Sequence, residues 1–165
     1  MGETSTATAT GETGGPVVLK GLAGLQERVG QPIGTSSWRT VAQDDINTFA
    51  TLTGDSQWIH VDPERAATGP FGATVQHGFL TLGMATGLLW EVCTVDGFGV
   101  VLNYGLNKVR FPAPVPVGSR VRGHCRLVDV TDVPNGVQAT IGGTVEIEGW
   151  PKPACVAEVL LRYAL

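Results

Sequence analysis

The sequence predicts a single α+β domain in which a curved antiparallel sheet wraps around one long buried helix. The stretch 77–92 is apolar on nearly every side, which is typical of a helix enclosed by protein. Four strand-like segments follow it, over residues 100–111, 119–130, 137–148 and 154–165. The chain has 165 residues, which is enough for one such core and too few for two domains.

The N-terminal segment Met1–Pro16 is rich in Thr, Gly and Ala and has no apolar run. Such a segment cannot bury enough surface to offset the entropy of ordering it, so we expect a disordered tail. The folded domain then covers residues 17–165. Its first element is expected to be a short helix before Gly30, since leucines recur every three positions, at Leu19, Leu22 and Leu25.

A strand is predicted over Thr35–Val41, because β-branched and aromatic residues favour extended backbone. A helix is predicted over Gln43–Thr53, with acidic residues in its first turn and Gly54 placed to end it. The residues on its apolar face are Ile46, Phe49, Ala50 and Thr53.

Asp62 and Pro63 have the residue types that begin a helix, the first as its cap. The long apolar helix is predicted over His77–Val92, where Gly78 permits close approach of a neighbouring backbone. Asn135–Gly136 predicts a tight hairpin between two of the later strands. A sheet this strongly curved leaves an edge or an open face, so we expect a homodimer.

Composition excludes several classes of protein. A formal net charge of −4, with 16% charged residues, argues against nucleic acid as a partner. No segment approaches the roughly 18 apolar residues of a membrane span, and the N-terminus does not resemble a signal peptide. The three cysteines are odd in number and lack ligand-like spacing, so neither a disulfide framework nor a zinc site is expected. A cytoplasmic setting fits these features.

The residues most informative about function are Asp55, His60 and Gly78. A carboxylate and an imidazole lie five positions apart, just after a predicted helix end. Gly78 would lie at the start of the apolar helix, where backbone N–H groups lack helical partners. A base, an acid and a donor to a developing anion are the parts that add water across a polarised double bond.

The run Phe49–Asp55, followed by His60 and then His77-Gly78-Phe79, resembles the MaoC-like, (R)-specific enoyl-CoA hydratases of the hotdog fold. The resemblance covers Val41–Leu165, with a weaker echo at Lys108–Pro112. It implies reversible hydration of trans-2-enoyl-CoA to (3R)-hydroxyacyl-CoA. The acyl group would be carried by coenzyme A or by acyl carrier protein, as part of the substrate, and no metal or redox cofactor would be needed.

The resemblance also implies roles for individual residues. Asp55 and His60 match the pair that holds the attacking water, and Gly78 matches the glycine whose N–H faces the thioester carbonyl. Thr86 falls where the family often has a serine that supports the aspartate, although the residue type by itself favours a hydrogen bond inside the core. Gln57-Trp58 stands where the family commonly has Asn-Pro, and we expect the bulkier Trp58 to shape either the acyl pocket or the loop that carries His60.

Three alternatives remain open at this stage. Hotdog folds also host acyl-CoA thioesterases, in which water attacks the thioester carbon, and non-catalytic acyl-binding subunits. His77 could serve the site or only bond local backbone. Four basic residues alternate along one predicted strand: Arg120, Arg122, His124 and Arg126. They predict a solvated face or, less favourably, contacts to the phosphates of coenzyme A. Lys108 and Arg110 could also make such contacts.

Overall fold

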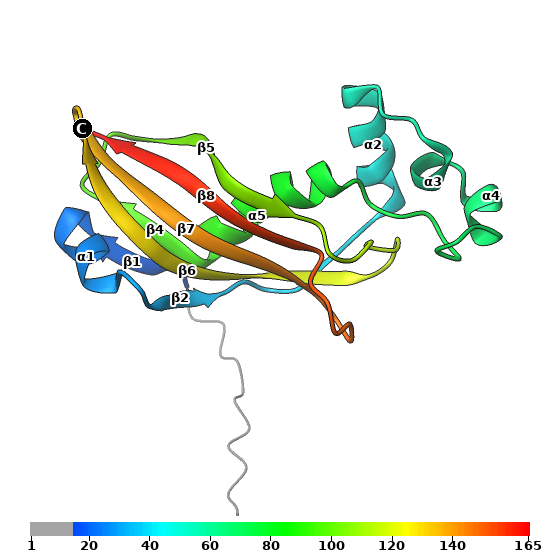
Figure 1. Cartoon of the computed structure of the whole chain (residues 1–165), viewed down its shortest axis with the longest axis horizontal. Coiled ribbons are helices and arrows are strands. Elements are labelled where there is room, and N and C mark those ends of the chain that lie inside the picture. The colour runs from blue at the N-terminus through cyan, green and yellow to red at the C-terminus, as the bar shows by residue number, and fades with distance from the viewer. Residues whose placement is uncertain (1–14) are drawn as a thin grey trace, which may run out of the picture.

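The computed structural model describes residues 15–165, so the disorder predicted for Met1–Pro16 lies almost entirely outside the described residues. The predicted α+β class is confirmed (Figure 1). The elements are β1 Val17–Lys20, α1 Gly21–Arg28, β2 Pro32–Thr35, β3 Arg39–Thr40, α2 Gln43–Thr53, α3 Trp58–Val61, α4 Pro63–Ala67, α5 Gly78–Val92, β4 Cys93–Asp96, β5 Val100–Arg110, β6 Arg120–Val133, β7 Gly136–Ile147 and β8 Cys155–Ala164.

The main sheet is antiparallel throughout, with the strand order β2-β6-β7-β8-β5 and the short β3 paired to β6. It curves around α5, and α2, α3 and α4 project beyond the N-terminal end of that helix (Figure 1). The four strands predicted after the long helix are confirmed, with ends shifted by a few residues. The parallel pair β1–β4 was not predicted, because four-residue strands are too short to show a periodicity.

The long helix is present as α5, but the prediction that it is buried on every side is wrong for the single chain. Its buried residues are Thr81, Leu88, Leu89 and Val92, whereas Phe79 is 72% exposed. The sheet covers one side of the helix only. Apolar side chains on the opposite side therefore remain at the surface, and their burial depends on something outside this chain.

The strand predicted over Thr35–Val41 is interrupted. The backbone N–H and hydroxyl of Ser37 both bond the Glu91 carboxylate on α5, which draws the chain away from the sheet. Ser36 bridges the gap, because its N–H donates to Gly123 and its hydroxyl accepts from the Gly123 N–H. Side-chain bonds to α5 thus override the extended propensity of this segment, and the strand divides into β2 and β3.

The predicted helix Gln43–Thr53 is confirmed as α2, with Ile46 and Ala50 buried. Gly54 ends it at φ 77°, in the left-handed region that glycine adopts without strain. The cap predicted at Asp62 is also confirmed, since its carboxylate accepts from the Arg65 N–H at 3.0 Å. The helix predicted before Gly30 is α1.

The predicted hairpin is confirmed between β6 and β7, but its turn lies one residue earlier than expected. Val133 pairs with Gly136, so Pro134 and Asn135 are the turn residues, and Asn135 has φ 62°. A primed turn does not form. Both primed turns need a positive φ at the first central position, and Pro134 at that position has a fixed negative φ.

Across residues 15–165, no helix combines the length and the hydropathy that crossing a bilayer requires.

Cys93, Cys125 and Cys155 are free and buried, and burial raises their pKa, to about 12 for Cys125 and about 11 for Cys155. A raised pKa leaves little thiolate at pH 8, and the thiolate is the reactive form. We therefore expect no reaction of the native protein with Ellman's reagent over several minutes, and reaction of three thiols after denaturation. Rapid modification of one native thiol would contradict the burial described here.

Candidate active site

Asp55 follows the glycine that ends α2, and its carboxylate oxygen Oδ2 lies 4.0 Å from His77 Nε2. Its side chain is 58% exposed and makes no hydrogen bond within residues 15–165. The backbone of Asp55 is held instead, because its carbonyl accepts from His77 Nε2 at 2.9 Å. The structure thus presents a free carboxylate on an anchored backbone.

His60 lies in the one-turn helix α3 and is 7% exposed. Its Nδ1 lies 2.6 Å from the carbonyl oxygen of Val75. Because a carbonyl only accepts, Nδ1 carries the hydrogen and Nε2 is left with its lone pair. Gln43 donates from Nε2 to the His60 carbonyl at 2.8 Å, so the backbone of α3 is also fixed. Sequence reasoning missed Gln43, which has no distinguishing signal at the start of a helix.

The four residues Thr74–His77 form a buried extended segment. On one side, its Val75 N–H donates to the Ile59 carbonyl at 2.9 Å. On the other, Gln76 N–H donates to Val115 at 2.8 Å, and Val117 N–H donates to Thr74 at 2.9 Å. The segment therefore joins α3, which carries His60, to the sheet side of the molecule.

Gly78 is the first residue of α5, as predicted, and no hydrogen bond among the described residues uses its N–H. It therefore supplies a free donor and the positive end of the helix dipole. Packing also requires glycine here, since a Cβ would lie 2.9 Å from Phe111 Cδ2. Phe111, at the end of the predicted echo Lys108–Pro112, was not recognised as part of the site.

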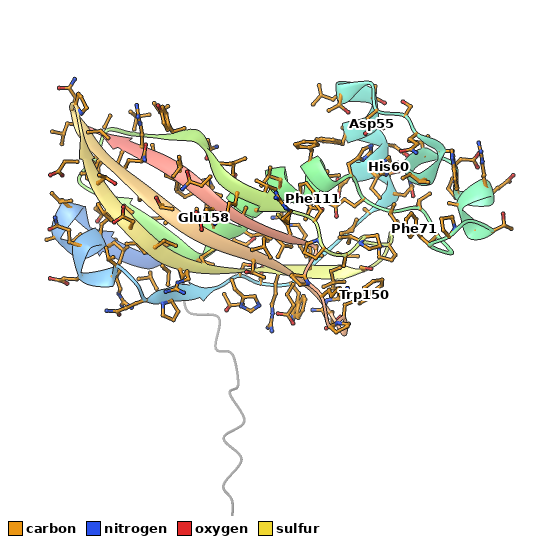
Figure 2. The ribbon with its side chains drawn as sticks, in the orientation of Figure 1. Asp55, His60, Phe71, Phe111, Trp150 and Glu158 are labelled. Atoms are coloured by element: carbon orange, nitrogen blue, oxygen red, sulfur yellow. The ribbon has the colours of Figure 1, made fainter. Side chains whose placement is uncertain are left out.

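These residues meet in one cavity of about 220 Å³. Its lining consists of Phe49, Thr53, Asp55, His60, His77, Gly78 and Phe79. The predicted residues Asp55, His60 and Gly78 are therefore brought together, although they lie on three different elements. Figure 2 shows Asp55 and His60 on the same side of the molecule, near the ends of α2 and α3.

The structure does not bring the predicted residues Trp58 and Thr86 to this cavity. The Arg65 guanidinium lies over the Trp58 ring, with Cζ 4.4 Å from the ring centroid. On Gly69, an added Cβ would lie 3.0 Å from the Trp58 ring. Thr86 lies two turns further along α5 and lines a separate apolar cavity. Three other large apolar side chains that could shape an acyl tunnel also lie away from this cavity: Phe71 in the loop after α4, Met84 beside α2 and Trp90 against the core.

Asp55, His60 and His77 each offer a donor atom within 4.8 Å of the others, which raises the question of a metal. An imidazole binds a metal close to its own ring plane, along the nitrogen lone pair. The two rings are stacked instead, with centroids 3.7 Å apart and planes 22° apart, so their lone pairs do not converge. The geometry does not suit a metal ion, and a metal-free site stays a prediction.

The basic residues of β6 point outward, as the alternation predicts. Three of them contact acidic residues on or just after β7, and Arg126 donates to the Gly30 carbonyl instead. Arg120 bonds Glu148 at 2.8 Å, and Arg122 bonds Glu146 at 2.8 Å. The hydrogen bond from Arg122 lowers the pKa of the Glu146 carboxyl, and burial partly opposes it. These neutralised pairs fit a solvated face rather than a phosphate site.

The family profile described as the MaoC like domain matches residues 25–148. The chain is 57% identical over 146 residues to 3-hydroxyacyl-thioester dehydratase Z of Mycobacterium tuberculosis, covering 88% of this chain and 97% of that protein. It is 44% identical over 139 residues to nodulation protein N of Rhizobium leguminosarum, covering 82% and 86%.

Among solved structures, the (R)-hydratase from A. caviae involved in PHA biosynthesis superposes with a TM-score of 0.66 at 25% identity. The match covers 81% of this chain and 94% of that one. The hotdog arrangement implied by the sequence resemblance is thereby confirmed.

The contact between Gly78 and Phe111 can be tested by a double-mutant cycle. Gly78→Ala is expected to lower the free energy of unfolding by about 1–3 kcal/mol, the usual cost of overpacking. In a protein that already carries Phe111→Ala, adding Gly78→Ala should lower the free energy of unfolding much less, because the clashing ring is gone. Thermal and denaturant unfolding measure both effects.

Gly83→Ala is the matched control on the same helix, because a Cβ there meets nothing within 4 Å. It should be neutral or stabilising, since alanine is favoured over glycine in a helix by about 1 kcal/mol. A coupling energy near zero between positions 78 and 111 would contradict the proposed packing.

Proposed function

Since this chain belongs to the MaoC-like family, we propose that it catalyses (R)-specific hydration of a trans-2-enoyl thioester and the reverse dehydration of the (3R)-hydroxyacyl thioester. The chain is a hydro-lyase of the dehydratase and hydratase type that acts on acyl thioesters. The configuration of the product and the use of coenzyme A as carrier belong to the proposal. The name of the A. caviae (R)-hydratase supports the configuration.

One observation carries the proposal: the Asp55 carboxylate, the His60 ring and the Gly78 N–H line the same small cavity. His60 presents Nε2 as an acceptor, because Nδ1 donates to Val75. A water molecule in the cavity can therefore donate one hydrogen to the carboxylate and the other to the imidazole, leaving its lone pair for attack at C3.

Attack at C3 moves negative charge to the thioester oxygen. The Gly78 N–H, at the positive end of α5, stabilises that charge, and one such donor contributes about 2.7–4 kcal/mol in other enzymes. The proton taken from water is then delivered to C2 from the same face, by the same pair of residues. The chain supplies the base, the acid and the hydrogen-bond donor to the developing anion, so we propose that no metal or redox cofactor takes part.

The acyl group is proposed to run from this cavity past Phe79, which also lines a neighbouring apolar cavity of about 320 Å³. That cavity lies between α5 and β5 and includes Leu82, Thr86 and Val159. Thr86 would then contact the acyl chain rather than support Asp55. Trp58 would act on substrate only indirectly, by holding the α3–α4 turn beside Arg65.

We also propose that the enzyme is a homodimer joined through β5. This strand has 11 residues, lies at the edge of the sheet and carries exposed apolar side chains, among them Val100, Leu102, Tyr104 and Leu106. A long apolar edge leaves backbone donors and acceptors free to pair with another strand. A second copy related by a twofold axis would pair its own β5 there and cover the exposed side of α5.

The first test follows loss of the conjugated enoyl absorbance with a short trans-2-enoyl-CoA, together with the chirality of the product. We expect an (R)-3-hydroxyacyl product, and a fall in kcat/KM of about 10²–10⁴-fold in Asp55→Asn and in His60→Gln, the range for loss of an acid or base. Both variants should keep their fold, because the Asp55 carboxylate is unbonded and glutamine still provides an amide donor near Val75.

The matched control is His124→Gln, which changes a histidine on the outer face of β6 and should keep full activity. Release of free thiol from saturated acyl-CoA, without hydration of enoyl-CoA, would favour a thioesterase instead. Inactivity in both assays would favour the non-catalytic acyl-binding role.

The dimer is tested by measuring mass in solution by light scattering. The wild type should have twice the chain mass, and Leu102→Asp should weaken association by about 2 kcal/mol or more, roughly thirtyfold in Kd, because it buries an unpaired charge at the interface. Val128→Asp changes a comparably exposed side chain on β6 and should leave the dimer intact. A wild type that is monomeric at micromolar concentration would contradict the proposal.

A further inference from the structure

His77 contacts both members of the proposed catalytic pair, although the proposed chemistry does not use it. It is the last residue of the buried segment Thr74–His77 and the N-cap residue of α5, with 2% of its side chain exposed. Its Nε2 lies 2.9 Å from the Asp55 carbonyl oxygen, and its ring stacks on that of His60. Phe49 packs against its ring as well, with centroids 5.0 Å apart.

The bond to Asp55 defines the tautomer of His77. Because the Asp55 carbonyl only accepts, Nε2 must carry the hydrogen, and Nδ1 is left with a lone pair. Nδ1 is buried and has no hydrogen-bond partner among the described residues. A buried polar atom without a partner lowers stability, and such atoms gather where a function requires the arrangement.

The same bond is what ties the loop after α2 to the body of the protein at Asp55. The other hydrogen bond of this residue is local and long, from its N–H to the Thr53 hydroxyl at 3.4 Å. Gly54, in the left-handed region, permits several backbone directions at the end of α2. Without the His77 bond, the direction of the Asp55 backbone, and with it the carboxylate, would be set only by this local geometry.

The stack fixes the second member of the pair. The bond from His60 Nδ1 to Val75 determines the direction of the ring within its plane, but allows rotation about that bond. His77 lies against the ring face, with centroids 3.7 Å apart, and blocks that rotation. Both contacts originate in one side chain, so the positions of Asp55 and His60 are coupled.

We propose that His77 is a positioning residue, which holds the Asp55 carboxylate and the His60 imidazole in the relative orientation that the shared water requires. This inference rests on the proposed hydration reaction. His77 does not itself exchange protons with substrate, because its Nε2 is occupied by the Asp55 carbonyl and its Nδ1 is buried. Its effect is on the geometry of the transition state, where a displacement of about 1 Å can cost about a hundredfold in rate.

A matched pair of variants separates the hydrogen bond from the stack. His77→Gln places an amide nitrogen close to the position of Nε2 and keeps the donor, whereas His77→Asn is one methylene shorter and cannot reach the Asp55 carbonyl. Both lose the ring equally. We expect kcat within about tenfold of wild type for glutamine and a loss of about a hundredfold for asparagine, with KM little changed in either.

Circular dichroism and thermal unfolding show whether each variant is folded, and His124→Gln again serves as the control. A folded His77→Asn with kcat within about threefold of wild type would overturn the positioning role. Equal losses in the two variants would also overturn it, since the donor would then not matter. A rise in KM at unchanged kcat would make His77 a binding residue instead, with the same consequence for the proposal.

An NMR measurement tests the contact without using activity. The chain has three histidines, so their ring nitrogens can be assigned by substitution. Long-range ¹H–¹⁵N spectra of the wild type should show His77 protonated at Nε2 and His60 at Nδ1. A His77 protonated at Nδ1, or exchanging between tautomers, would overturn the inference even if asparagine at this position fails to fold.

The two levels of proposal fail differently. An inactive wild type with the expected tautomers would overturn the hydration function, and the positioning role with it. An active wild type with an unaffected His77→Asn would overturn the positioning role alone.

Discussion

The site depends on the hydrogen bonds that the buried segment Thr74–His77 makes on both of its sides. Its backbone bonds Ile59 on one side and Val115 and Val117 on the other, while the Val75 carbonyl accepts from His60. The helices α2, α3 and α4 project beyond the sheet and bury little apolar surface of their own (Figure 1). Hydrogen bonds to this segment therefore supplement the packing of Ile46 in the core. Helix α3 is held by main-chain bonds, and α2 by the bond from the Thr74 hydroxyl to Gln43, because buried polar groups must be paired.

This constraint gives the two proposed catalytic side chains different environments. His60 is buried, bonded at Nδ1 and stacked on its face, so only Nε2 remains for chemistry. Asp55 is held through its backbone, and its carboxylate lines the cavity without a hydrogen bond of its own. A water that enters the cavity meets one rigid acceptor and one partly exposed acceptor. Binding of an acyl thioester over the mouth of the cavity would remove water from the carboxylate and strengthen its interactions at the moment of reaction.

The apolar surface of the chain is incomplete around the same site. Phe79 lies beside Gly78 and is 72% exposed, and the edge strand β5 presents Leu102 and Tyr104 to solvent. The apolar cavity between α5 and β5 opens onto this surface. A partner copy that covers β5 would therefore enclose the proposed acyl path as well, which links assembly to the hydrophobic contacts that a fatty acyl group needs. The proposed dimer would thus account for the apolar residues on the exposed side of α5, which one chain leaves uncovered.

The sequence by itself determined the elements that depend on local chemistry. Helix α2 and its end at Gly54, the cap at Asp62, the later strands and the run from Asp55 to Gly78 all follow from residue type and spacing. Tertiary structure decided whatever depends on partners distant in the chain. Ser37 left the predicted strand because Glu91 on α5 bonds it, and Trp58 turned from the cavity to pack beside Arg65. The contacts of His77 with Asp55 and His60 are of this kind. Local propensity acts over a few residues, whereas a stacked ring and a hydrogen bond 22 positions apart exist only once the chain has folded.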